Sequence, residues 1–282
     1  MKRRAFLAGI GAAAAPLLVA RAQQPARVFR IGCMFLAPLE SPVAQQLLGA
    51  FREGLRELGY VEGQSLAFEH RSAEGQIERF PDLAADLVAL TPDLIATMSN
   101  AATHAAGRAT TTIPIVCFNL GDPVGEGLVA SLARPGGNLT GFTIFAPELA
   151  PKALSLLHQA FPMASRIAAL WFPGSLTEHT AEGMLRKAET TAQALGVALL
   201  LVRGRGADDL DDAFSTMVRD RAEALLVLPS PASNVERQRI ADLAARHRLP
   251  SMSWSREYVE AGGLLAYGSN LPENWRRGAT IR

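Results

Sequence analysis

The chain has 282 residues, of which 49% are hydrophobic and 20% are charged, and its formal net charge is +1. This is a globular composition, and the length allows one large domain or two domains of about 120 residues each. No basic cluster with interleaved aromatic residues occurs, so the sequence gives no indication of a nucleic-acid partner.

The first 22 residues have the pattern of an export signal peptide. Three basic residues at 2–4 precede a mildly apolar stretch at 5–20, and Ala-Arg-Ala at 20–22 fits a small-residue cleavage site. The arginine pair followed by Ala-Phe-Leu resembles a twin-arginine signal. We therefore expect cleavage after Ala22 and a periplasmic mature chain. The alternatives are a general secretion signal and an anchor that stays in place.

Beyond this segment, apolar runs alternate with amphipathic stretches to the end of the chain. Apolar runs predict strands at 27–35, 65–70, 93–98, 113–118, 138–143, 166–172, 197–203, 223–229 and 249–254. Helical spacing predicts helices at 43–59, 77–90, 101–110, 123–133, 148–161, 177–196, 208–221 and 234–248. Near-continuous apolar strands separated by helices indicate parallel sheets that are covered on both faces.

The strands fall into two sets, which predicts an α/β protein with two doubly wound parallel-sheet lobes joined by a hinge. Residues 27–146 are expected to form lobe 1 and residues 147–256 lobe 2. Residues 257–282 are expected to cross back to lobe 1. The competing architecture is an eight-fold barrel.

The two cysteines, Cys33 and Cys117, both lie in predicted buried strands. In a doubly wound sheet of order 2-1-3-4, the third strand separates these two strands. Their Cα atoms would then be about 10 Å apart, given a strand spacing of about 4.8 Å. A disulfide requires less than about 7 Å, so we expect two buried free thiols.

Ligands of open α/β sheets bind beyond the carboxyl ends of the strands. The candidate ligand-binding residues at those ends are Ser41, Ser99, Asn100, Asn119, Asp122, Trp171, Ser175, Ser230 and Tyr267. A helix start at Ser99 and Asn100 suits a carboxylate, and Asp122 suits an ammonium group. Together they would fit a small zwitterion such as an amino acid. The alternative for each Ser, Asn or Asp is plain helix capping.

Motifs for catalysis, nucleotides and metals are missing. The stretch GDPVGEG is not followed by the Lys of a phosphate-binding loop, and no G-x-S-x-G elbow occurs. The five histidines have no metal-ligand spacing. The sequence therefore predicts no cofactor and no metal, and it favours binding over turnover.

Three stretches, RFPDLAADLVALTPDLIAT, TTTIPIVCFNLGDPVGEGLVASLARPGGNLTG and RIADLAARHRLPSMSWSREYVEAGGLLAYGSNL, resemble the ABC-transporter substrate-binding proteins of the tryptophan/tyrosine-binding-like family. The resemblance spans about residue 28 to the end, and its second stretch is the most specific. It implies a type I periplasmic-binding fold, a monomer whose two lobes close on a small solute, and an ABC permease as partner. An amino acid, aromatic in preference, is the solute that the resemblance favours.

Members of that family usually continue past the YGSNL…RRGA segment with a further strand and helix, so we expect a truncated tail here. Two other functions stay open at this point. The same fold could serve as a ligand-sensing module of a signalling receptor, or as a periplasmic α/β enzyme.

Overall fold

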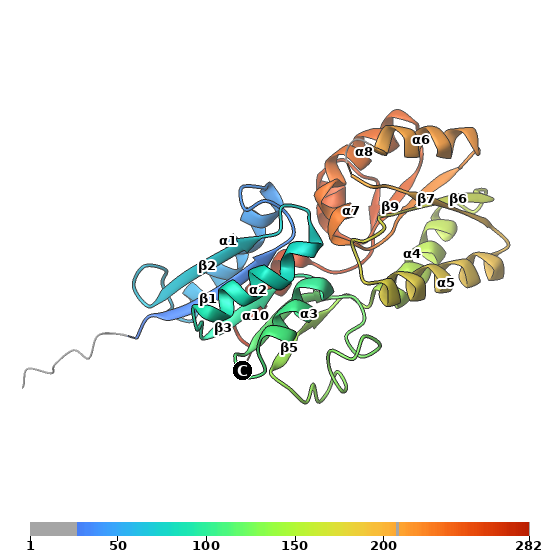
Figure 1. Ribbon diagram of the computed structural model, residues 1–282. Coiled ribbons are helices and arrows are strands. Elements are labelled where there is room, and N and C mark those ends of the chain that lie inside the picture. Colours follow the sequence, from blue (N-terminus) through green and yellow to red (C-terminus); the bar gives the residue numbers. More distant parts are fainter. Residues whose placement is uncertain (1–26, 207–208, 282) are drawn as a thin grey trace, which may run out of the picture.

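The computed structural model describes residues 27–206 and 209–281, which fold into two α/β lobes (Figure 1). The expected signal peptide and its cleavage site lie outside the described residues. Each lobe contains one five-stranded sheet, and every strand pair within the sheets is parallel. The prediction of two parallel-sheet lobes is confirmed.

The first sheet has the order β2-β1-β3-β4-β5. Its strands are β1 (Phe29–Phe35), β2 (Leu66–Ser72), β3 (Leu94–Thr97), β4 (Ile115–Leu120) and β5 (Leu139–Thr143). Its helices are α1 (Pro42–Glu57), α2 (Phe80–Ala89), preceded by the short η1 (Ile77–Arg79), and α3 (Asn100–Ala109). One core cluster joins α1 to the sheet, and a second joins α2 and α3 to the opposite face.

The second sheet has the order β10-β9-β8-β6-β7. Its strands are β6 (Arg166–Trp171), β7 (Ala198–Arg203), β8 (Ala224–Val227), β9 (Ser251–Ser253) and β10 (Leu265–Ala266). The helices α4 (Ala146–Ala160) and α5 (Glu178–Leu195) cover one face. The helices α6 (Leu210–Arg219), α8 (Arg237–Arg246) and α9 (Arg256–Glu260) pack on the other face, and α7 (Pro231–Val235) precedes α8.

The helices form where the sequence supplies both a cap and an apolar stripe. Ser41 caps α1, and Pro42 occupies its first turn, where the missing N–H costs nothing. Val43, Leu47 and Phe51 then follow at helical spacing, and all three are buried. This local chemistry explains why α1 coincides so closely with the predicted helix.

The predicted helix at 123–133 is wrong, because residues 123–133, all of them described, form a series of turns. The N–H groups of Leu128 and Val129 both donate to the carbonyl oxygen of Pro123, and Gly127 adopts a positive φ of 68°. Its apolar residues do not share a buried face, since Val124 and Leu132 are exposed. This segment is called the β4–β5 loop below.

Two other boundaries also differ from expectation. The single helix expected at 234–248 is two helices, α7 and α8, because the backbone leaves the helical conformation at Glu236. The return to the first lobe begins later than residue 257, since α9 and β10 still belong to the second lobe. The chain crosses back only after Ala266, and α10 (Leu271–Gly278) packs against α1 and β4.

Cys33 in β1 and Cys117 in β4 are both buried and free, and β3 lies between their strands. The expected free thiols are thus confirmed.

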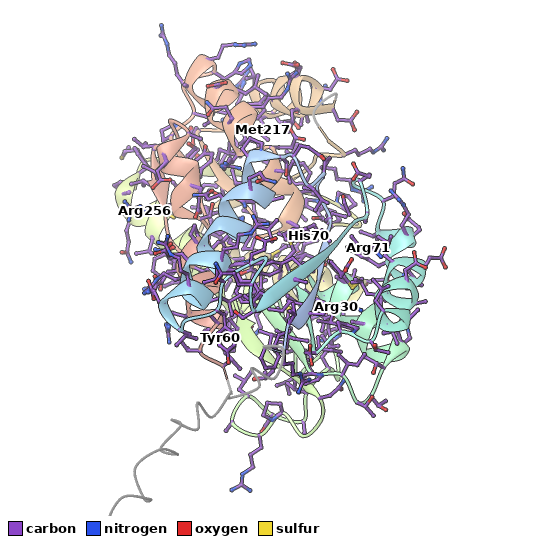
Figure 2. All side chains as sticks on the ribbon, turned by 90° about the vertical axis from the view of Figure 1, so that its left-hand side faces the viewer. Arg30, Tyr60, His70, Arg71, Met217 and Arg256 are labelled. Atoms are coloured by element: carbon purple, nitrogen blue, oxygen red, sulfur yellow. The ribbon has the colours of Figure 1, made fainter. Side chains whose placement is uncertain are left out.

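Figure 2 looks onto the outer side of the first lobe, where His70 and Arg71 belong to the edge strand β2. Charged side chains on an edge strand disfavour pairing with another chain.

Within residues 27–206 and 209–281, no helix combines the length and the apolar character that a membrane span requires. The same residues contain no group of three or more His, Cys, Asp or Glu side chains arranged to hold a metal ion.

Candidate functional site

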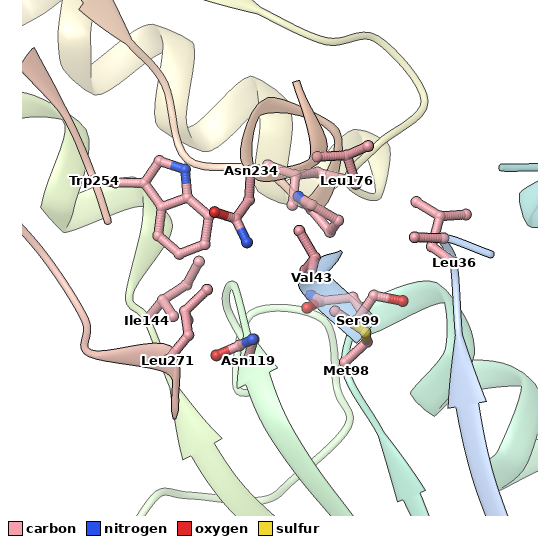
Figure 3. A pocket seen from close by; sticks show the side chains of 14 residues that line it. Leu36, Val43, Met98, Ser99, Asn119, Ile144, Leu176, Asn234, Trp254 and Leu271 are labelled. Atoms are coloured by element: carbon pink, nitrogen blue, oxygen red, sulfur yellow. The ribbon is translucent and has the colours of Figure 1, made fainter. Parts of the chain in front are cut away.

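A pocket lies between the two lobes, at the carboxyl ends of the strands of both sheets (Figure 3). The cavity among its lining side chains has a volume of only about 20 Å³. The first lobe contributes Leu36, Ala37, Val43, Met98, Ser99, Asn100, Asn119 and Ile144, and the chain beyond it contributes Leu176, Pro231, Asn234, Val235, Trp254 and Leu271. The free space between these side chains is narrow, so a solute of amino-acid size requires the lobes to part further.

Ser99 and Asn100 enter the pocket because β3 ends at its edge and α3 begins there. The Ser99 hydroxyl accepts a hydrogen bond from the Ala102 N–H at 3.2 Å, which makes Ser99 the cap of α3. Thr103 donates to the Ser99 carbonyl oxygen at 2.8 Å and contacts the Thr97 hydroxyl at 2.7 Å. This buried network fixes the start of the helix at the pocket wall.

The amide of Asn100 is held at both of its polar atoms. Its Oδ1 accepts from the Gly121 N–H at 2.8 Å, and its Nδ2 donates to the Thr180 hydroxyl at 3.4 Å. Gly121 follows β4 in the first lobe, whereas Thr180 belongs to α5 in the second. Asn100 therefore lines the pocket and touches both lobes.

Asn119 near the end of β4 is different, because its Oδ1 is buried and has no hydrogen-bond partner among the described residues. A buried acceptor without a partner costs roughly 1–3 kcal/mol, and such groups are rare in folded proteins. Asn119 lines the pocket wall, so a bound molecule could supply the donor that the described residues do not.

The second lobe supplies a flat apolar surface and one amide. Trp254 follows β9, and its indole N–H donates to the Ser233 hydroxyl at 3.0 Å, which fixes the ring. Asn234 of α7 extends its side-chain amide toward the middle of the pocket, and its Oδ1 accepts from Ser255 at 3.3 Å (Figure 3). Ile144 and Leu271 face the Trp254 ring from the other side of the pocket (Figure 3).

None of the described residues that line the pocket carries a charge. Its polar groups are the Ser99 hydroxyl, the three amides of Asn100, Asn119 and Asn234, and the start of α3. A charged group of a solute would therefore be met by amide dipoles and the helix N-terminus, not by an opposite full charge.

The structure brings three of the nine candidate residues into the pocket wall: Ser99, Asn100 and Asn119. Asp122 lies outside it. Its Oδ1 accepts from the Gly125 N–H at 2.9 Å, and its Oδ2 is 3.6 Å from His179 Nε2. Asp122 thus bonds within its own turn, and because the described residues directly after it form turns and no helix, it does not cap a helix either.

The other five candidates also lie outside the pocket wall. Ser41 caps α1, and Ser230 caps α7. Ser175 accepts from the Ala232 N–H, and Trp171 lies under the Arg203 guanidinium. Tyr267 is exposed. Short polar residues before helices are used for capping here, as they are in most proteins.

Asn234, Met98, Leu36 and Leu271 are pocket residues that sequence reasoning missed. Asn234 was expected as the first residue of a long helix, but the Ser230-Pro231 pair, a cap followed by a proline, could have placed the helix start before it. Trp254 is the last residue of a predicted strand, and this position at a strand end could have indicated that it lines the pocket.

Two parallel α/β lobes with a pocket between their strand ends define a two-lobed solute-binding protein of the type I periplasmic-binding fold. Residues 34–276 match the family described as ABC transporter substrate binding protein. The chain belongs to this family, which is a family of binding proteins.

Individual relatives agree with this assignment. A tyrosine-binding protein of Clostridioides difficile (strain R20291) is 30% identical over 133 residues, which are 47% of this chain and 38% of that protein. The chain thus matches well under half the length of this relative. A conserved domain protein of Vibrio cholerae has the same fold, with a TM-score of 0.79, 23% identity, and coverage of 90% of this chain and 83% of that one. An ABC domain from Streptococcus pneumonia in complex with L-Trp gives a TM-score of 0.77, with 20% identity and the same coverage.

Proposed function

We propose that the mature chain is a monomeric periplasmic protein that binds an amino acid, in preference an aromatic one, and delivers it to an ABC permease. The observation that carries the solute proposal is the partnerless Asn119 Oδ1 in a pocket faced by Trp254. The ligands of two relatives, tyrosine and L-Trp, support an aromatic side chain. The charged edge strand β2 supports the monomer, and the signal-like residues 1–22 support export.

The lining suggests how each part of such a solute would be bound. The solute carboxylate would lie at the start of α3, near Ser99 and Asn100, where backbone N–H groups and the helix dipole favour an anion. The ammonium group would donate to Asn119 Oδ1. The aromatic ring would lie against Trp254, Ile144 and Leu271, where stacked or edge-to-face contact adds to simple burial.

A thermal-shift screen of the mature chain from Gln23 tests this proposal. L-tyrosine and L-tryptophan are compared with L-alanine, which shares the ammonium and carboxylate but lacks the ring. A ligand at a hundredfold excess over its Kd adds about 2.7 kcal/mol to the free energy of unfolding. A rise in Tm with the aromatic amino acids and not with L-alanine supports the proposal. A cooperative melt that neither aromatic amino acid shifts would overturn this choice of solute.

A further inference from the structure

The β4–β5 loop reaches from the first lobe to the second and carries a buried carboxylate, that of Glu126. Glu126 Oε1 accepts hydrogen bonds from the hydroxyls of Thr177 and Thr180, which belong to the second lobe. Glu126 Oε2 is 2.9 Å from His104 Nε2 of α3 in the first lobe. The side chain of Glu126 is only 2% exposed. One carboxylate thus joins both lobes.

The second-lobe partners of Glu126 stand at the start of α5. Thr177 is the cap residue of this helix, but its hydroxyl makes no capping bond to the helix backbone and donates to Glu126 instead. The N-terminus of a helix carries a partial positive charge and attracts anions. The first lobe therefore places a carboxylate where the second lobe presents the positive end of a long helix.

The same contact continues into the pocket wall. The Thr180 hydroxyl donates to Glu126 and accepts from Asn100 Nδ2, and Asn100 Oδ1 accepts from the Gly121 N–H. The two lobes also touch directly here, because a Cβ added to Gly121 would lie 2.7 Å from Thr180 Cγ2. A continuous series of hydrogen bonds thus runs from Glu126 to a residue that lines the pocket.

We propose that Glu126 is a positioning residue of the binding site, which latches the first lobe to α5 when the lobes are closed and, through Thr180, holds Asn100 in the pocket wall. Two-lobed binding proteins close by hinge motion, and hydrogen bonds to a charged acceptor are stronger than neutral ones. His104 belongs to the same lobe as Glu126 and stays with it in any open arrangement. Hinge opening therefore breaks only the bonds to Thr177 and Thr180.

Other charged groups beside the latch act less strongly. Asp122 directly precedes the β4–β5 loop and faces His179 of α5 at 3.6 Å, but both side chains are partly or largely exposed and the pair is screened by solvent. Lys187 further along α5 pairs with Glu148 of α4, within the second lobe. The Glu126 carboxylate is therefore the buried charged group through which the described β4–β5 loop contacts α5, by hydrogen bonds from Thr177 and Thr180.

Distances between spin labels on the two lobes test this proposal on the full chain without any solute, so its failure is distinguishable from a wrong choice of amino acid. Labels are attached to Gln46→Cys on α1 and Gln193→Cys on α5, both at exposed positions. The buried Cys33 and Cys117 are inaccessible to the label. The reference is the labelled chain in which Glu126, Thr177 and Thr180 are intact. Relative to it, we expect the distance between the labels to shift by several ångströms in Glu126→Gln and, separately, in the double variant Thr177→Val with Thr180→Val.

Two control variants separate a latch from a loss of structure. Thr177→Ser with Thr180→Ser keeps both hydroxyls and is expected to keep the original distances. Glu148→Gln removes an ion pair of the same helix within the second lobe, and it too is expected to leave the distances unchanged. Unchanged distances in both Glu126→Gln and the double valine variant would overturn the proposal, as would equal shifts in the valine and serine variants.

Discussion

Trp275 of α10 stacks on Phe118 of β4, with ring centroids 4.1 Å apart and ring planes 18° apart. Both side chains are fully buried, and Phe35 of β1 stacks on the same indole at 5.5 Å. Asn119, which lines the pocket, directly follows Phe118. The last helix of the chain therefore supports the strand that presents a pocket residue.

Trp275→Ala is expected to lower the free energy of unfolding by roughly 3–5 kcal/mol, because it empties a large space between α10 and the first sheet. Urea denaturation monitored by circular dichroism measures the loss. Trp275→Phe should cost less, since it keeps an aromatic ring and removes an indole N–H that has no partner among the described residues. A loss of less than about 1 kcal/mol for the alanine variant would show that α10 does not stabilise the first lobe.

Asn119→Leu is expected to leave the free energy of unfolding unchanged or to raise it by about 1 kcal/mol, since it removes a buried acceptor that has no protein partner. Such a change runs against the usual destabilising effect of a core substitution. The same urea experiment measures it without solute. A marked destabilisation would mean that the asparagine serves the fold and not a bound molecule.

Burial raises the pKa of the Cys33 thiol strongly, and burial also raises the pKa of the Cys117 thiol although neighbouring hydrogen bonds oppose it. Because the thiolate is the reactive form, neither cysteine should react with a thiol reagent in the folded chain. Both should react once the chain is unfolded in urea. A thiol count with Ellman's reagent checks this, and rapid labelling of the folded chain would contradict the buried positions.

The pH dependence of stability should contain a contribution from Glu126. Burial raises the pKa of its carboxyl, but hydrogen bonds from His104, Thr177, Thr180 and Asn100 outweigh burial and hold the pKa below its ordinary value of 4.5. A carboxyl whose pKa is lowered by folding stabilises the folded state above its unfolded pKa. That contribution is lost as the pH falls through the lowered value.

Urea midpoints of the wild type and Glu126→Gln, measured from about pH 7 down to about pH 3, test this sign. The difference in urea midpoint between the wild type and Glu126→Gln should be constant near neutral pH. It should shrink in the acid range, below the ordinary carboxyl pKa. Comparison of the two variants removes the parallel effects of Asp93, Glu223 and Glu273, whose pKa values are also lowered. A midpoint difference in favour of the wild type that grows as the pH falls would contradict a lowered pKa of Glu126.

Much of the fold could be predicted because each buried strand is a short apolar run and most helices carry their own cap and apolar stripe, as α1 does. The helix expected at 123–133 failed because Val124 and Leu132 fit helical spacing although neither is buried. Spacing alone does not show whether a packing partner exists, and glycine-rich turns can satisfy the same pattern.

The site was harder to predict, because a pocket between lobes depends on how the lobes approach each other. Residues near the carboxyl ends of the first-lobe strands, such as Ser99 and Asn119, could be placed from the alternation of strands and helices. Asn234 and Leu271 reach the pocket only through the packing of α7 and α10. Asp122 satisfies the same sequence rule as Asn119, yet its local turn directs it to the Gly125 N–H.

Calorimetric titration of the mature chain with L-tyrosine and L-tryptophan, compared between the wild type and Asn119→Leu, tests the central claim most directly. Asn274→Leu serves as control, because it removes an asparagine of α10 that lies outside the pocket wall. We predict that the wild type and the control bind an aromatic amino acid, and that Asn119→Leu binds at least about tenfold more weakly, the equivalent of about 1.4 kcal/mol. Equal affinity in all three proteins would contradict the pocket between the lobes as the solute site.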